Sequence, residues 1–297
     1  MPSLHLPTRL SLWMLLLLLP IGAGCTTAAV ATPRPVLITI AGSTAMHPVL
    51  QELTDAFTRR YPNVIFTLRG GGSTLGEEQI AAGRIDLAAS TLFPPEKTAP
   101  GSARLVRVPI GVDGLAVIVH AGNPVADLTV EQLRRIYSGD ILDWAEVGGD
   151  AGEIELVSRE DGSGSRWLFE ERVMQEEAVS LAAVVMPTSR DVVDYVAKTP
   201  LAIGYVSRGL VMNSAAGAPS PASSAAGATP APLRVHVVAV EGVVPSLTAL
   251  RRQEYALIQP LYLISRGQAR DALRQFIDFV LSPAGQGIVA RYHLPVR

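Results

Sequence analysis

The 297-residue sequence predicts an α/β fold, and two observations lead to this prediction. Short apolar runs of strand type alternate with amphipathic runs of helix type, which is typical of parallel sheets flanked by helices. Three segments rich in glycine and hydroxyl side chains also follow strand-like runs and precede helix-like runs, at residues 41–44, 69–74 and 159–165. Because ligands bind in such folds at the carboxyl ends of the strands, these segments are the candidate ligand loops.

In the first part of the chain, residues 36–40 form the first expected strand, and it ends at Gly42. Apolar side chains then recur at helical spacing over residues 49–57, and Tyr61-Pro62 ends that helix. A strand over residues 64–68, a turn at 70–73 and a helix to Ile80 follow, and further strands are expected at 85–89, 103–109 and 115–120.

The pattern changes after Asn123-Pro124, where Thr129 is expected to begin an amphipathic helix. A strand over residues 154–158 delivers Arg159 into the third glycine-rich segment. The later expected elements are a helix at 191–197, strands at 201–206 and 235–240, and a helix at 271–280. Trp144 and Tyr205 are expected to pack in the core.

Residues 213–232 carry no charge and no aromatic side chain and consist mainly of Ala, Ser, Pro and Gly. Such a segment has too few apolar side chains to build a core, so it is expected to be a disordered surface insertion.

The N-terminal residues resemble an export signal. Arg9 precedes an apolar run over residues 12–19, which is far shorter than the ~20 residues of a membrane-spanning helix. Small residues then lead to Cys25, as in the lipobox of bacterial lipoproteins, although Gly22 stands where such boxes usually carry leucine. We expect residues 1–24 to be a signal peptide, Cys25 to be lipidated and residues 25–35 to be a linker. The alternative is ordinary cleavage near Gly24 with an incidental cysteine.

Charge and composition exclude several kinds of partner. Without residues 1–24 the chain carries 24 basic and 27 acidic side chains, a net charge of −3, and no basic stretch suggests a nucleic-acid partner. One cysteine and five scattered histidines show no metal-ligand spacing, so neither metal nor cofactor is expected.

The three glycine-rich segments point instead to a small oxyanion. Helix N-termini present unpaired backbone N–H groups, which together with hydroxyl donors bind anions. Arg159 supplies a guanidinium whose planar donors match the oxygens of phosphate.

With these segments in place, the chain from about Leu37 onward resembles the substrate-binding lipoproteins of phosphate ABC transporters. The matching motifs, in order, include Gly42-Ser43-Thr44, Gly72-Ser73, residues 83–90, residues 139–144, residues 159–165, residues 202–206 and residues 279–286. The resemblance implies a two-lobed type II periplasmic-binding-protein fold, each lobe a mostly parallel sheet flanked by helices, that closes over phosphate. Lobe 1 would comprise residues 36–116 and 233–297, and lobe 2 residues 117–212.

The same resemblance implies the site residues. The expected phosphate contacts are Thr44, the Ala45 amide, Ser73, Thr91, Arg159, Ser163, Gly164 and Ser165. Asp161 would hold Arg159 by a hydrogen bond, and Ser43 would lie just behind the contacts. Thr91 stands where phosphate-specific members carry an aspartate, which leaves the preferred anion open.

The resemblance therefore implies a monomeric, non-enzymatic protein on the outer face of a bacterial membrane that passes phosphate to an ABC permease. Sulfate, molybdate or tungstate as the ligand, and a sensor role with the same site, remain alternatives. Glu77-Glu78 stands where a P-loop needs Lys-Ser/Thr, which excludes an NTPase. A serine hydrolase is a remote alternative, since Gly162-Ser163-Gly164 contains a serine but no Gly-x-Ser-x-Gly motif occurs.

Overall fold

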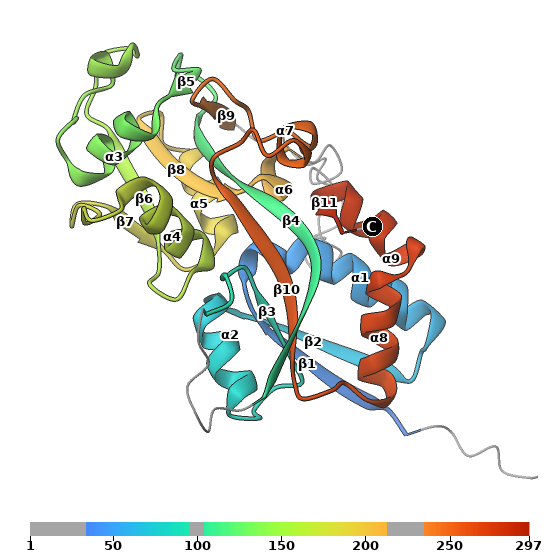
Figure 1. The fold of residues 1–297 in the computed structure, drawn as a ribbon. Helices are drawn as coiled ribbons and strands as arrows, with labels where there is room; N and C mark the ends of the chain where they lie inside the picture. Colours follow the sequence, from blue (N-terminus) through green and yellow to red (C-terminus); the bar gives the residue numbers. More distant parts are fainter. Residues whose placement is uncertain (1–33, 96–103, 213–234, 297) are drawn as a thin grey trace, which may run out of the picture. The chain divides into compact units, whose positions relative to one another are not determined.

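The computed structural model describes residues 34–95, 104–212 and 235–296 (Figure 1). The chain divides into two units, Met1–Arg34 and Pro35–Arg297, and the second unit contains every helix and strand named below. The expected signal peptide, the Cys25 lipidation site and the 213–232 insertion lie outside the described residues.

The order of strands and helices alternates as the sequence predicts. The strands are β1 (Val36–Gly42), β2 (Val64–Gly71), β3 (Leu87–Ser90), β4 (Leu105–His120), β5 (Asp127–Leu128), β6 (Glu155–Arg159), β7 (Val184–Met186), β8 (Ala202–Ser207), β9 (Val235–Val240), β10 (Ile258–Arg266) and β11 (Leu294–Pro295). The α-helices are α1 (His47–Arg60), α2 (Gly72–Ala81), α3 (Val130–Ser138), α4 (Gly164–Phe169), α5 (Ser189–Val196), α6 (Arg208–Val211), α7 (Leu247–Arg251), α8 (Asp271–Leu281) and α9 (Pro283–Tyr292). Short 3₁₀ helices η1 (Thr44–Met46) and η2 (Trp144–Val147) and a π-helical turn η3 (Glu170–Met174) complete the elements.

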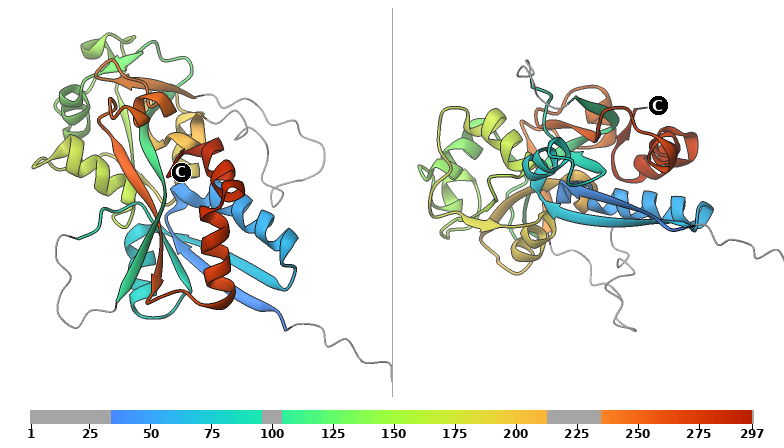
Figure 2. Two further views of the ribbon diagram at one scale, coloured as in Figure 1. Left: turned by 45° about the vertical axis from the view of Figure 1, so that its right-hand side comes forward. Right: turned by 90° about the horizontal axis from the view of Figure 1, so that it is seen from below.

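Eight strands form one path in the order β2-β1-β3-β10-β4-β8-β6-β7, while β9 and β11 pair with β4 outside this path and β5 pairs with β9. β1 is parallel to β2 and β3, and β6 is parallel to β7 and β8. β10 and β4 are antiparallel to each other and run between the two parallel groups (Figures 1 and 2). The carboxyl ends of β1, β3 and β6 lead directly into η1, Thr91 and α4, where the candidate ligand residues lie.

The expectation of two strands at 103–109 and 115–120 is wrong, because β4 is continuous from Leu105 to His120. Its first part pairs with β10 and its last part with β8 and β9. The pairing with β10 shifts by one residue between Leu261 and Tyr262, so the strand accommodates the irregular stretch without a break.

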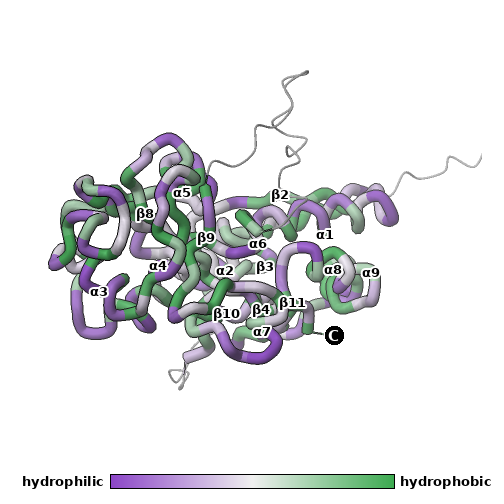
Figure 3. Tube along the Cα trace, turned by 90° about the horizontal axis from the view of Figure 1, so that it is seen from above, coloured by the Kyte–Doolittle hydropathy of each residue, from purple (hydrophilic) through white to green (hydrophobic). Residues whose placement is uncertain are grey.

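Four groups of buried apolar side chains stabilise the described part of the chain, and the two largest are described here. The Phe57 cluster is formed mainly by β1, α1, β10 and α8, and Phe57 packs edge-on against Phe66 and Phe276. α1 contributes Val49, Leu50 and Leu53 to it, and in Figure 3 this helix is banded between hydrophobic and hydrophilic residues, as expected for one buried face.

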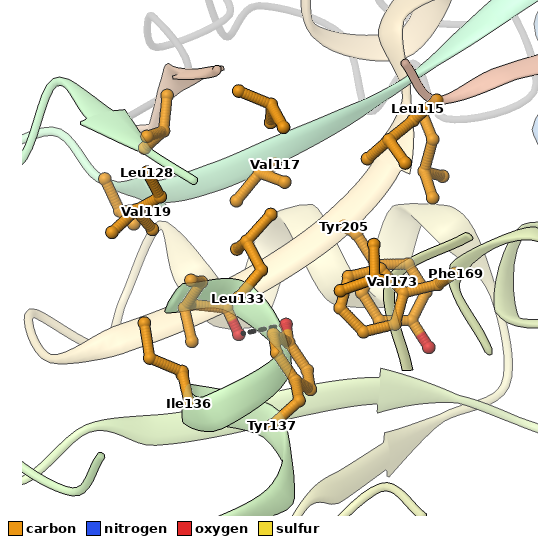
Figure 4. Packing of buried hydrophobic residues seen from close by; sticks show 14 of the residues in the cluster. Leu115, Val117, Val119, Leu128, Leu133, Ile136, Tyr137, Phe169, Val173 and Tyr205 are labelled. Carbon is orange, nitrogen blue, oxygen red and sulfur yellow. Dashed lines mark hydrogen bonds between the residues drawn. The ribbon is translucent and has the colours of Figure 1, made fainter. Parts of the chain in front are cut away.

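The Tyr205 cluster is formed around α3, α4, β8 and the second part of β4 (Figure 4). Tyr205 stacks on Phe169 with ring centroids 4.2 Å apart, and Tyr137 packs edge-on against Phe169. Trp144 is also fully buried in this cluster, so the expectation that Trp144 and Tyr205 pack in the core is confirmed.

Residues 235–257 pack with the Tyr205 cluster, which contains Val238, Val240 and Leu257. β9 pairs with the last part of β4. This packing differs from the predicted boundaries, which place residues 233–297 with the first lobe. None of the described helices is both long and apolar enough to cross a membrane.

Candidate functional site

All of the expected contact residues are buried where the glycine-rich segments meet. The side chains of Ser73 and Thr91 are fully buried, and the others are 1–7% exposed or buried glycine: Thr44, Ala45, Arg159, Ser163, Gly164 and Ser165. Ser43, at 4% exposed, precedes η1, and its amide donates to the carbonyl of Ala89 at 2.9 Å, which joins the ends of β1 and β3. Buried polar side chains in such numbers require partners, and their partners are largely one another.

Arg159 connects the ends of β6 and β1. It is the last residue of β6 and is 1% exposed, yet its guanidinium lies beside the first turn after β1. Nη2 donates to Thr44 Oγ1 at 3.2 Å, and Nη1 donates to Ser189 Oγ at 2.8 Å. The side chains of Thr44 and Arg159, 115 residues apart in the sequence, therefore form one polar group.

Ser189 is a site residue that the sequence analysis missed. It is the first residue of α5, is 1% exposed, and its backbone N–H donates to Thr44 Oγ1 at 3.2 Å. Thr188 begins the helix by accepting from the Asp191 amide. The Thr188-Ser189 pair before a helical run was a usable signal, although no glycine accompanies it.

The predicted bond between Asp161 and Arg159 is wrong. Asp161 has 91% of its side chain exposed and pairs with Arg166 at 2.6 Å. Glu160 pairs with Arg159 instead, accepting from Nε at 3.0 Å and from Nη2 at 2.8 Å. The reason is the direction of the turn after β6, which points residue 161 outward, while the longer glutamate before it reaches back to the guanidinium.

Ser73 and Thr91 form a second polar group. The Thr91 amide donates to Ser73 Oγ at 3.1 Å, and the two hydroxyl oxygens are 3.4 Å apart. A Cβ at Gly164 would overlap Thr91 Oγ1 and would lie 2.7 Å from Ser73 Oγ. Glycine is therefore required at this position, because the first residue of α4 touches both hydroxyls.

The glycine-rich loops before α2 and α4 are also in direct contact. The Thr74 amide donates to the Gly162 carbonyl at 3.2 Å, and a Cβ at Gly72 would overlap that carbonyl group. The segment beside the Phe57 cluster and the segment beside the Tyr205 cluster are thus also joined through backbone atoms.

The Glu160 carboxylate already pairs with the guanidinium of Arg159, and three other titratable groups around the site have shifted pKa values. Burial lowers the pKa of His47, which follows η1, so this imidazole is neutral near pH 7. Burial raises the pKa of Tyr205 to about 12, and its hydroxyl lies 2.7 Å from Ser158 Oγ just before Arg159. Burial acts to lower the pKa of Arg166, but the carboxylates of Glu170 and Asp161 outweigh it and raise the pKa.

Chemically, this arrangement can hold an oxyanion. It offers hydroxyl donors, backbone N–H groups at the starts of η1, α2 and α4, and one buried guanidinium. Ser163 Oγ accepts from the Arg166 amide as the cap of α4, so its hydrogen bond is structural. The described residues hold no group of three or more His, Cys, Asp or Glu side chains placed to bind a metal ion.

Known proteins show the same combination of fold and sequence. Residues 29–284 match the family model described as the PBP superfamily domain. The chain is 26% identical over 245 residues to the phosphate-binding protein PstS of Bacillus subtilis, which covers 82% of this chain and 75% of that protein. It is 23% identical over 262 residues to the phosphate-binding protein PstS of Borreliella burgdorferi, covering 85% and 87%.

Solved structures of phosphate-binding proteins are also similar to this chain. A phosphate ABC transporter substrate-binding protein from Clostridium perfringens with bound phosphate superposes with a TM-score of 0.75 and 29% identity, covering 88% of this chain and all of that one. An ABC-type phosphate transport receptor from Vibrio cholerae superposes with a TM-score of 0.65 and 27% sequence identity. The match covers 88% of this chain and 100% of that chain. The predicted α/β binding-protein fold is confirmed by these likenesses, and the relatives are binding proteins rather than enzymes.

Proposed function

Because the chain belongs to the PBP superfamily, we propose that it captures inorganic phosphate outside the cytoplasm and delivers it to an ABC permease. The relatives named above are phosphate-binding proteins, and one of them holds phosphate in a fold that superposes on this chain. Proteins of this kind bind without making or breaking a covalent bond, so no catalytic residue is assigned.

The observation that carries the proposal is the buried guanidinium of Arg159. Its Nη1 and Nη2 donate to the hydroxyls of Ser189 and Thr44, which are themselves able to turn and donate to an anion. The amides of Ala45 and Gly164 and the hydroxyls of Ser73, Thr91 and Ser165 complete the proposed contacts.

Calorimetry of the ligand-stripped protein with phosphate, sulfate and molybdate tests this assignment. A charged hydrogen bond contributes roughly 1.5–3 kcal/mol, so Arg159→Ala weakens phosphate binding at least about tenfold. Arg190→Ala is the matched control, because Arg190 is exposed and pairs only with Asp194. Unchanged affinity in Arg159→Ala would remove this residue from the site.

Another tetrahedral oxyanion is the second candidate, and Thr91 is the observation that favours it. In phosphate-specific relatives a carboxylate is expected at this position, whereas the structure has a fully buried threonine hydroxyl there. A threonine can donate or accept a hydrogen bond, so it suits anions with or without a proton. A higher affinity for sulfate or molybdate than for phosphate in the calorimetric panel would support this candidate.

We further propose that the protein is a monomeric lipoprotein anchored through Cys25. The support is the sequence alone: a short apolar run, small residues and a lone cysteine. Cys25→Ser is expected to move the protein from the detergent phase to the aqueous phase after expression in a bacterium that processes lipoproteins. Identical partitioning of mutant and parent would contradict lipidation.

A further inference from the structure

One end of the molecule carries a concentration of arginines that the anion site does not use. They come from the end of α1, the turn before β3, the start of β4, the end of β10 and the residue before α8. We call this surface the basic end, and its arginines are Arg59, Arg60, Arg84, Arg104, Arg266 and Arg270.

Strand direction places these residues along one edge of the sheet, where β1, β2 and β4 begin and β10 ends. β1 and β2 begin side by side, with Val36 opposite Val64, and the C-terminal end of α1 precedes β2. β10 ends where β4 begins, with Arg266 opposite Leu105, in the lower part of Figure 1. A cavity of about 530 Å³ lies here between residues 83–86 and 266–270.

The charge of the basic end is not balanced locally. Within the described part of the chain, none of the six arginines of the basic end forms an ion pair. Arginines elsewhere in the protein do form ion pairs with carboxylates. The carboxylates close to these arginines in the sequence are Asp55, one turn before Arg59 on α1, Asp86, which accepts from the Thr39 amide at 2.8 Å, and Asp271. Six arginines against three carboxylates contrast with a net charge of −2 for the whole chain.

Exposed apolar side chains border the same surface. At the start of β1, Val36 is 39% and Leu37 68% exposed, and Ile65 on β2, which is opposite Leu37, is 46% exposed. Guanidinium groups beside exposed aliphatic side chains are the combination that binds the headgroup region of a membrane.

The connection to the N-terminal segment supplies the orientation. The chain enters the folded unit at Pro35, directly before β1 and therefore at the basic end. Only ten residues separate Pro35 from Cys25, and at about 3.5 Å per residue they reach at most ~35 Å.

We propose that the basic end is a membrane-binding surface whose arginines contact the phosphate groups of anionic phospholipids. This inference rests on the proposed lipoprotein anchor for its orientation, but its charges and apolar border are independent of the anchor. A surface of this kind adds electrostatic attraction to anionic lipids to the hydrophobic attachment of the proposed lipid anchor.

The test uses residues 26–297, which lack the signal peptide and the lipidated cysteine but keep every residue of both apolar clusters. Co-sedimentation is measured with vesicles of phosphatidylcholine alone and of phosphatidylcholine with phosphatidylglycerol. We expect binding to the anionic vesicles only, and loss of binding as the salt concentration rises.

Reversing the charge of arginines at the basic end tests whether this surface binds the vesicles. Arg266→Glu with Arg270→Glu is expected to lower partitioning onto anionic vesicles at least about tenfold, since each arginine near such a surface contributes about 1 kcal/mol. Arg251→Glu with Arg252→Glu, at the end of α7, is the matched control and should leave partitioning unchanged. Phosphate affinity, measured by calorimetry, should be the same in both variants.

Three outcomes would overturn the inference: no binding to anionic vesicles, equal binding to neutral vesicles, or an equal loss in the control variant. A failure of phosphate binding in the parent protein would contradict the proposed function instead, so the two failures are distinguishable.

Discussion

At the scale of single residues, Ser189 ties Arg159 to Thr44, because its hydroxyl accepts from the guanidinium while its amide donates to the threonine. We expect Ser189→Ala to leave Nη1 of Arg159 without this acceptor and to weaken anion binding about tenfold, as expected for a charged hydrogen bond. The measurement is calorimetric titration with phosphate. Ser138→Ala is the control, because its hydroxyl donates to the Arg135 carbonyl on the exposed surface of α3. Equal affinities of Ser189→Ala and parent would show that the Ser189 hydroxyl does not contribute to anion binding.

We expect Thr91 to determine how strictly a protonated anion is required. A carboxylate at this place accepts a hydrogen bond from protonated phosphate and repels sulfate, which has no proton near pH 7. A threonine hydroxyl adapts to either anion. We therefore expect weak discrimination between phosphate and sulfate in the parent and sharper discrimination in Thr91→Asp.

Competition titration with both anions near neutral pH measures this difference. The neighbouring hydroxyl Ser73 lies 3.4 Å from Thr91 Oγ1, so the new carboxylate keeps a hydrogen-bond donor. Exclusion of sulfate by the parent at a thousandfold excess would show that another group supplies the acceptor.

The sequence predicted most of the site at this scale, and the reason is backbone geometry. Glycines beside Ser73 and Ser163 mark places where loops approach closely. Arg159 could be recognised as a candidate because it is a cation at the end of an expected strand. Ser189 had a local signal only as part of a helix start, and its contact with Arg159 depends on how α5 is placed in space. Glu160 could not be predicted, because its role depends on the orientation of the turn after β6.

At the scale of elements, the contact between the glycine-rich loops limits how closely they approach. Gly72 has φ +83°, and a Cβ there would overlap the Gly162 carbonyl. We expect Gly72→Ala to separate the two loops and to weaken anion binding more than tenfold. Affinity is measured by calorimetry and stability by thermal unfolding.

Gly148→Ala separates steric overlap from backbone strain. Gly148 has φ +84°, nearly the same as Gly72, but no atom lies within 4 Å of its Cβ position. In both variants the left-handed backbone conformation of the new alanine destabilises the protein by about 1 kcal/mol. A similar affinity in the two variants would contradict a role of loop contact in binding.

The middle of β4 contains a buried carboxylate in contact with an imidazole. Asp113 is fully buried, lies 3.0 Å from Nδ1 of His293 and accepts from Gln259 at 3.1 Å. Burial acts to raise the pKa of Asp113, but the contacts with His293 and the charge of Arg208 outweigh it and hold the pKa below its ordinary value.

A carboxylate with a lowered pKa in the folded state stabilises the protein above its ordinary pKa of about 4, and this stability is lost as the pH falls through the folded-state pKa. We expect Asp113→Asn to lower the free energy of unfolding by about 2 kcal/mol at pH 7 and by less near pH 3. Urea unfolding at both pH values measures it. Asp194→Asn, at an exposed pair on α5, is the control. A pH-independent difference would show that Asp113 acts through packing alone.

Elements with strong local signals were predicted well. Thr129 begins α3 with a reciprocal capping box, and β9 has the expected bounds. β4 was split because glycines interrupt its apolar pattern, and β10 was not predicted because Pro260 argues against a central strand. In both strands long-range pairing overrides the local preference.

At the scale of the whole molecule, aromatic rings join the segment after β3 to α4. Phe93 lies 5.9 Å from Trp167 between ring centroids, and the Arg172 guanidinium lies 5.9 Å from the centre of the Phe93 ring. Thr91 lies two residues before Phe93, and Ser165 lies two residues before Trp167. The aromatic contact thus bridges the two sides of the site.

Such a pair contributes about 0.5–1.5 kcal/mol, so Phe93→Ala should speed anion dissociation roughly two- to tenfold. Stopped-flow measurement of phosphate release tests this expectation. Leu142→Ala, an exposed apolar residue 57% accessible, is the control. An unchanged dissociation rate would show that the aromatic contact does not hold the two sides together.

The same contact gives the protein a built-in optical signal. Among the described residues the tryptophans are Trp144, fully buried in the Tyr205 cluster, and Trp167, 39% exposed beside Phe93. The indole of Trp144 emits from a constant apolar environment, whereas that of Trp167 emits from an environment that changes whenever the two sides of the site move apart. Ultraviolet emission of the unlabelled protein therefore reports the position of α4 directly, and a shift to longer wavelength marks the arrival of water at that ring.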